Sequence, residues 1–169
     1  AIHRAAHLAR STEHSGRPIL FTTFTRNLAD AIEHDLRNLA GTSVAARIEV
    51  LNVDRLSYRV VQDAEGSKPA IVSGNELTAL WRDVVDERGI DHPPEFLHHE
   101  WEQVILAQGC TSREEYFAAS RAGRGVRLDR RQRAEVWKAV EALNRTLIDR
   151  GKRTHLQLAA AAAGYLAQR

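Results

Sequence analysis

One stretch of the sequence decides the fold, and it reads Ile19-Leu20-Phe21-Thr22-Thr23-Phe24-Thr25-Arg26-Asn27-Leu28-Ala29. Its apolar first half predicts a short buried strand, and the rest predicts a helix that Thr25 can cap. Residues at such a junction lie at the carboxyl end of the strand, where α/β sheets bind ligands. Threonine hydroxyls and a helix N-terminus suit phosphate groups, and an aromatic ring suits the face of a base. The junction is therefore the strongest clue to function in the chain.

The sequence around this junction predicts a small α/β region. In the helix after the junction, apolar residues recur at helical spacing, namely Leu28, Ile32, Leu36 and Leu39. Gly41 supplies a stop, a second short strand is predicted at 47–51, and another helix is predicted at 54–61. A polar connection at 63–69 contains glycine and proline and predicts a domain boundary. We therefore expect two domains, residues 1–68 and residues 69–169.

The second half of the chain reads as helical. Ser73 and Ser112 each precede a glutamate by three residues and predict capping boxes, and Asp129 can cap the helix with the strongest apolar stripe. Residues 71–72 indicate only a brief extended piece. The apolar stripes carry three tryptophans, namely Trp81, Trp101 and Trp137. The predicted fold class is therefore α/β and mostly helical.

Composition bounds the class of protein. The chain has 169 residues, of which 43% are hydrophobic, and a net charge of only +2, so any affinity for nucleic acid must come from a local patch. The longest apolar run, 158–163, is far too short to span a bilayer, and no signal-peptide pattern occurs. A single cysteine, Cys110, excludes an internal disulfide and a multi-cysteine zinc site. We expect a cytoplasmic protein without a membrane partner.

The densest charge cluster is the glycine-containing segment 121–133, in which six arginines surround Asp129. Glycine lets a backbone approach a phosphate chain closely, and arginine suits bidentate phosphate contact. Three of these arginines are predicted to bind DNA, namely Arg121, Arg124 and Arg127. The alternative is a solvated face whose arginines pair with nearby glutamates, namely Glu114, Glu115 and Glu135.

Four stretches, in this order along the chain, resemble the UvrD/Rep family of superfamily 1 DNA helicases. Thr23-Phe24-Thr25-Arg26-Asn27-Leu28-Ala29 stands in the slot of motif Ia, where the family has Thr-Phe-Thr-Asn-Lys-Ala-Ala. The other three resemble the helix after the Walker A loop, motif Ib and the family's helical insertion, at residues 1–8, 48–56 and 100–137. The resemblance covers nearly the whole chain.

The resemblance implies an incomplete RecA-like (P-loop NTPase) piece over 1–68 and a helical insertion subdomain over 69–169. In the family, ATP hydrolysis drives movement along single-stranded DNA and unwinding of duplex, so both forms of DNA are the implied partners. The residues implied to contact DNA are Thr23, Phe24, Thr25, Arg26 and Asn27. From the residues alone, the alternative is that Phe24 belongs to the core and that Thr25 is only a helix cap.

Motif Ib matches loosely. The segment 52–56 lacks the aromatic residue and the histidine that the family has there, and it contains Asp54. A carboxylate there would repel phosphate. We therefore expect Asp54 to be a helix N-cap rather than a DNA contact.

The ATP-binding motifs are missing from the sequence. Residues 151–154 imitate the end of a Walker A loop but lack its first glycine, and residues 84–87 imitate a Walker B ending but follow apolar residues at helical spacing. By the resemblance, the chain is a piece that lies between Walker A and Walker B. We expect no cofactor in this piece, ATP and magnesium in the intact helicase, and no ATPase activity in the isolated chain.

Two other readings follow from the residues. His3 and His7 share a helix face, and His98 and His99 precede Glu100, but neither group shows a full set of metal ligands.

The alternative to a helicase fragment is a non-catalytic helical interaction module that binds a protein partner or nucleic acid. Its tryptophan-bearing stripes would then form a partner surface instead of a core.

Overall fold

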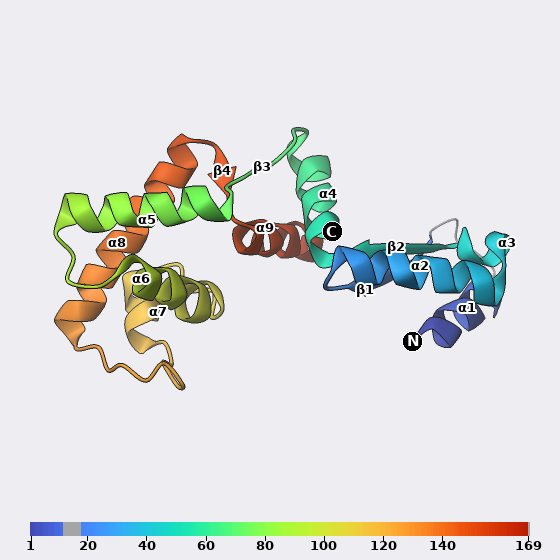
Figure 1. Cartoon of the computed structure of the whole chain (residues 1–169), viewed down its shortest axis with the longest axis horizontal. Coiled ribbons are helices and arrows are strands. Elements are labelled where there is room, and N and C mark those ends of the chain that lie inside the picture. Colours follow the sequence, from blue (N-terminus) through green and yellow to red (C-terminus); the bar gives the residue numbers. More distant parts are fainter. Residues whose placement is uncertain (12–17, 169) are drawn as a thin grey trace. The chain divides into compact units, whose positions relative to one another are not determined.

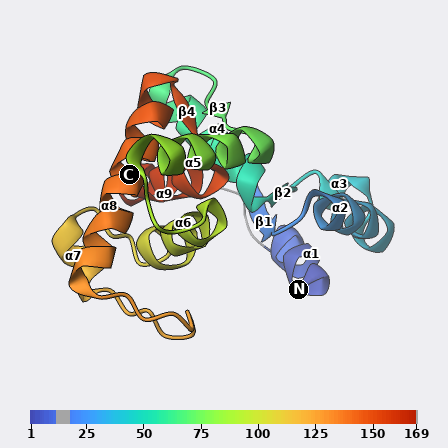
Figure 2. The same cartoon turned by 60° about the vertical axis from the view of Figure 1, so that its left-hand side comes forward.

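The computed structural model describes residues 1–11 and 18–168, and over these residues the protein is mostly helical (Figures 1 and 2). The chain divides into two compact units. The N-terminal unit comprises Ala1–Lys68 together with the segment from Leu158 onward, and the helical unit comprises Pro69–Gln157. The segment from Leu158 onward, predicted to lie in the second domain, thus groups with the N-terminal unit.

The N-terminal unit contains a short parallel sheet flanked by helices (Figure 1). Its elements up to the boundary are α1 Ile2–Ser11, β1 Ile19–Thr23, α2 Arg26–Ala40, α3 Thr42–Ala45, β2 Ile48–Asn52 and α4 Val53–Glu65. The two strands pair in parallel, from Ile19 opposite Ile48 to Thr23 opposite Asn52. The predicted pair of strands is confirmed, with the second strand one residue further along than expected.

The core of the N-terminal unit lies between α1, α2 and the sheet. Small residues of α1, namely Ala5, Ala6 and Ala9, are buried against Ile32, Leu36 and Ile48. Alanine at these positions lets the helix approach closely, and Ile32 and Leu36 form the buried stripe of α2. Leu28 and Leu39, which the periodicity also placed on that stripe, are 49% and 43% exposed because they flank the contact.

Helix ends in the N-terminal unit follow local chemistry. The Thr25 hydroxyl accepts a hydrogen bond from the Leu28 backbone N–H at 3.2 Å, as expected of an N-cap. Gly41 ends α2 with a φ of 81°, a conformation that favours glycine. The prediction that Asp54 is an N-cap is wrong, because α4 begins directly after the strand, with Asn52 at the cap position. Asp54 lies in the first turn, where the helix dipole favours a carboxylate.

The helical unit is built around the long helix α8. Its elements are β3 Ala70–Ile71, α5 Gly74–Arg88, α6 Pro94–Glu100, the π-helix η1 Trp101–Leu106, α7 Arg113–Ala118, α8 Arg130–Asp149 and β4 Lys152–Arg153. Helix α9, His155–Ala167, begins in this unit, and its residues from Leu158 belong to the other. Helices α5, α6 and α7 all pack against α8. The predicted caps at Ser112 and Asp129 are both present as capping boxes.

The tryptophans form the core of the helical unit. Trp81, Trp101 and Trp137 are 1%, 0% and 8% exposed. Trp81 and Trp101 meet edge to face with ring centroids 5.8 Å apart, and Tyr116 stacks on Trp137 at 6.1 Å. The tryptophan stripes therefore lie in the core and do not form an open partner surface.

A short pair of parallel strands, β3 and β4, belongs to the helical unit, and β4 was not predicted from the sequence. Ala70 pairs with Lys152, and Ile71 pairs with Arg153. Ser73 caps α5 as predicted, but the carboxylate of Glu76 binds the Lys152 ammonium at 2.7 Å instead of completing a capping box. Of the residues that imitate a Walker A ending, Lys152 and Arg153 form strand β4, and Thr154 caps α9. Those that imitate Walker B lie within α5, as the helical spacing predicted.

Candidate nucleic-acid interface

The junction between β1 and α2 presents an aromatic ring to solvent. The side chain of Phe24 is 87% exposed, whereas the preceding Thr23 is only 7% exposed. The alternative in which Phe24 belongs to the core is therefore wrong. The other half of that alternative, a cap at Thr25, is confirmed by its hydrogen bond to Leu28. An exposed ring held between a strand and a capped helix is available to stack on a base.

The parallel register brings the β1–α2 junction and the β2–α4 junction to the same end of the sheet, the carboxyl end of its strands. Thr23 is opposite Asn52, so the residues that follow β1 and those that follow β2 leave the sheet at the same end. Arg26 and Asn27 open α2 with exposed side chains. Four of the five predicted contact residues at this junction are thus exposed, and Thr23 is the buried exception. Asp54 is exposed in the first turn of α4, so the favourable side for an anion is the α2 side.

The loop between α7 and α8 projects from the helices (Figure 2). The side chains of two of its arginines, Arg121 and Arg124, nevertheless turn inward. Their common partner is Glu100, whose side chain is fully buried. Arg121 donates from Nε and Nη2 to the two carboxylate oxygens, and Arg124 donates from Nε to Oε2 at 3.1 Å. The Tyr116 hydroxyl adds a fourth hydrogen bond, to Oε1 at 2.9 Å. We call these four residues the Glu100 cluster.

Further contacts hold the loop to this cluster. Arg121 Nη1 donates to the Val126 carbonyl at 2.6 Å, and Arg124 Nη1 donates to Gln103 Oε1 at 2.8 Å. The side chains of Arg121 and Arg124 are only 7% and 14% exposed. The guanidinium groups of Arg121 and Arg124, which were predicted to bind DNA, are therefore bound inside the protein. Of the three predicted arginines, Arg127 is the one with an exposed side chain.

The alternative prediction for the segment 121–133 was a solvated face whose arginines pair with Glu114, Glu115 and Glu135. One of those pairs is present, because Glu135 lies 3.2 Å from the exposed Arg131. The other two glutamates are engaged outside the segment, since Glu114 lies 3.7 Å from Arg113 and Glu115 accepts from backbone N–H groups at the start of α7. Glu100 was not among the glutamates predicted to pair with these arginines. The sequence did contain a signal for the burial of Glu100, because this residue lies at helical spacing between two apolar residues, Leu97 and Val104.

Burial and hydrogen bonding act in opposite directions on Glu100. Burial raises the pKa of its carboxyl, but hydrogen bonds from Arg121, Tyr116 and Arg124 outweigh this and hold the pKa below its ordinary value of 4.5. The hydrogen bond to Glu100 in turn raises the pKa of Arg121. Burial, followed by the charge of Glu100, raises the pKa of the Tyr116 hydroxyl. The cluster is therefore a charged structural network at neutral pH rather than a proton donor.

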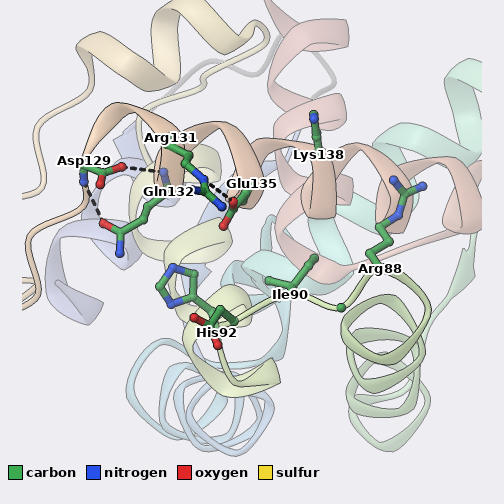
Figure 3. A pocket seen from close by; sticks show the side chains of 10 residues that line it. Arg88, Ile90, His92, Asp129, Arg131, Gln132, Glu135 and Lys138 are labelled. Atoms are coloured by element: carbon green, nitrogen blue, oxygen red, sulfur yellow. Dashed lines mark hydrogen bonds and ion pairs between the residues drawn. The ribbon is translucent and has the colours of Figure 1, made fainter.

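A groove of about 790 Å³ lies along the first turns of α8 (Figure 3). Both signs of charge line it. Asp129 and Gln132 bond each other in the capping box, and Arg131 pairs with Glu135. These charges compensate one another, so the groove offers no field of a single sign to an ionic ligand.

Neither a metal-binding group nor a membrane-spanning helix occurs among residues 1–11 and 18–168. No group of three or more histidine, cysteine, aspartate or glutamate side chains is placed to hold a metal ion there. None of the helices in that part is long and apolar enough to cross a bilayer. Burial raises the pKa of the Cys110 thiol, which keeps it in the unreactive protonated form.

Fold and site together define a mostly helical α/β protein with a small parallel sheet and an exposed aromatic residue at the carboxyl end of its first strand. Comparisons with protein-family models, with curated proteins and with solved structures find no match.

Proposed function

We propose that this chain is part of an ATP-dependent DNA helicase of the UvrD/Rep type and that it supplies DNA contacts to the intact motor. In this proposal, residues 1–68 belong to a RecA-like domain and the helical unit is its insertion. ATP and magnesium bind to parts of the helicase outside this chain, so the chain alone does not hydrolyse ATP. The observation that carries the proposal is the exposure of Phe24 at the strand–helix junction.

Physical chemistry favours single-stranded DNA as the ligand of this junction. Every base has a π-face, so stacking on Phe24 would not depend on sequence and would contribute about 1–3 kcal/mol per base. Arg26 lies in the first turn of α2, where the helix dipole disfavours a cation. A phosphate beside it would be attracted both to the guanidinium and to the backbone N–H groups of that turn. The same site thus accommodates a base and its phosphate.

The proposal is tested by measuring the affinity of the full chain for a fluorescent oligonucleotide. We expect weak binding without sequence preference that falls as salt rises. Replacing the ring, Phe24→Ala, should weaken binding to single-stranded DNA by about 1–3 kcal/mol, which is roughly 5- to 150-fold. The matched control is Ile148→Ala, because Ile148 is also an exposed apolar residue, at 76%, and lies in the helical unit. Equal affinities of the Phe24 variant and the unaltered chain would refute the proposed contact.

A further inference from the structure

A basic pocket lies between α7 and α8. It has a volume of about 530 Å³ and is lined by Arg113, Glu114, Phe117, Ala118, Arg130 and Arg133. The ring of Phe117 is half-buried, and the guanidinium carbons of Arg113 and Arg130 lie 5.5 Å and 5.9 Å from its centroid. Cation–π attraction to one ring therefore holds two exposed arginines close together.

The floor of this pocket is fixed by Arg133. Its Nη1 donates to the carbonyl oxygens of Tyr116 and Phe117 at 3.0 Å and 2.8 Å, at the end of α7. Its guanidinium carbon also lies 5.7 Å from the centroid of the Tyr116 ring. These contacts tie α8 to α7, so the spacing between the two exposed arginines is set by packed elements and not by a flexible loop.

Charge in the pocket is mainly positive. Three arginines line it against one acidic residue, Glu114, which lies 3.7 Å from Arg113 and is 77% exposed. Such an exposed pair contributes little, so Arg113 is easily drawn to another anion. Arg130 is the first residue of α8, where the positive end of the helix dipole adds to its charge. An anion bound here would relieve this unfavourable arrangement.

We propose that this pocket binds the phosphodiester backbone of DNA, with Arg113 and Arg130 each contacting a phosphate. The proposal rests on the proposed function, since it adds a DNA contact on the helical unit to the one at Phe24. It also reassigns the backbone contact on this unit, because Arg121 and Arg124 are bound to Glu100. Phe117 acts as a positioning residue that holds the two guanidinium groups.

The test compares two double variants of the full chain. Arg113→Gln with Arg130→Gln removes the proposed phosphate contacts. The control, Arg82→Gln with Arg145→Gln, removes the same charge from exposed positions of α5 and α8 that do not line the pocket. Affinity is measured at several salt concentrations for a single-stranded and a duplex oligonucleotide. The pocket variant should lower the slope of log affinity against log salt by about 0.7 per arginine on single strands or about 0.9 on duplex, whichever form the pocket binds. Blue-shifted tryptophan emission confirms that each variant is folded.

The outcomes separate this inference from the proposed function. Weaker binding by both the pocket variant and Phe24→Ala supports the two sites together. An effect of Phe24→Ala alone, with the pocket variant equal to its control, overturns the pocket and leaves the proposed function standing. An effect of the pocket variant alone supports the pocket and overturns the Phe24 contact. Absence of any DNA binding by the unaltered chain overturns both.

Discussion

The β1–α2 junction and the loop between α7 and α8 were both predicted to contact DNA, yet they place their side chains in opposite ways. The junction exposes an apolar ring, Phe24, whereas the loop buries two charged groups, Arg121 and Arg124. The difference teaches that the number of charges in a segment does not measure its surface charge. What decides is whether a partner inside the protein satisfies those charges.

Glu100 is that partner, and its own position explains the loop. A carboxylate buried among apolar residues is costly unless charged groups and hydrogen bonds compensate it. Two arginines and a tyrosine provide this compensation here. The Glu100 carboxylate in turn offsets the cost of burying the two arginines. The loop and the helix that carries Glu100 therefore stabilise each other. At the β1–α2 junction, by contrast, the Leu28 backbone N–H is satisfied locally by the Thr25 hydroxyl, and the Phe24 side chain stays exposed.

The largest expected effect comes from removing the charge that organises the loop. Glu100→Gln leaves Arg121 and Arg124 without their counter-ion in a buried site, so we expect a loss of about 3–5 kcal/mol in the free energy of unfolding. Urea denaturation followed by tryptophan fluorescence measures it. The control is Glu114→Gln, whose exposed carboxylate should change stability by less than about 0.5 kcal/mol. Similar stabilities of the two variants would show that the cluster does not hold the loop.

Acid should weaken the helical unit. Hydrogen bonds from Lys152 lower the pKa of Glu76, and backbone N–H groups of Thr111 and Ser112 lower that of Glu115, as the cluster does for Glu100. A carboxyl group with a lowered pKa in the folded state contributes stability above its ordinary value of 4.5, and this is lost as pH falls through the folded pKa. We therefore expect unfolding to be promoted below about pH 4.5.

Tryptophan fluorescence is the natural reporter of this acid transition, because all three tryptophans lie in the helical unit. Glu100→Gln should reduce the dependence of stability on pH in this range. An equal dependence in the variant and the unaltered chain would contradict a lowered pKa at Glu100.

A smaller effect is expected at the junction. Thr25→Ala removes the hydroxyl that accepts from Leu28, so the free energy of unfolding of the N-terminal unit should fall by about 1 kcal/mol. Thr25→Ser keeps the acceptor and should restore most of the loss. Hydrogen exchange of the α2 amides measures both changes. A loss at Thr25 as large as that at Glu100 would break the contrast between a locally satisfied junction and a loop held by distant contacts.

Much of the fold could be read from neighbours in sequence. The two strands, the caps at Thr25, Ser112 and Asp129, and the burial of the tryptophans were all predicted, because caps and stripes depend on residues three or four positions apart. Within the candidate site, the sequence indicated the position of the junction and the cap.

Other features could not be read in this way. The π-helix that follows α6 and the pairing of β3 with β4 were missed. The latter joins Ala70 to Lys152, residues far apart in the chain, and two-residue strands carry too little pattern to predict. The exposure of Phe24 was also undecided, because alternation along a short strand does not fix the side on which the next residue leaves the sheet.

The sequence by itself determined most of the helices, the two strands of the N-terminal sheet, the caps at Thr25, Ser112 and Asp129, and that arginines gather before α8. Only the tertiary structure decided which of those arginines face solvent. Glu100 and Arg121 are 21 residues apart and meet because α6 and α7 both pack against α8. Local propensities act over a single turn, whereas the cost of a buried charge is settled by whichever groups the whole packing brings within hydrogen-bonding distance.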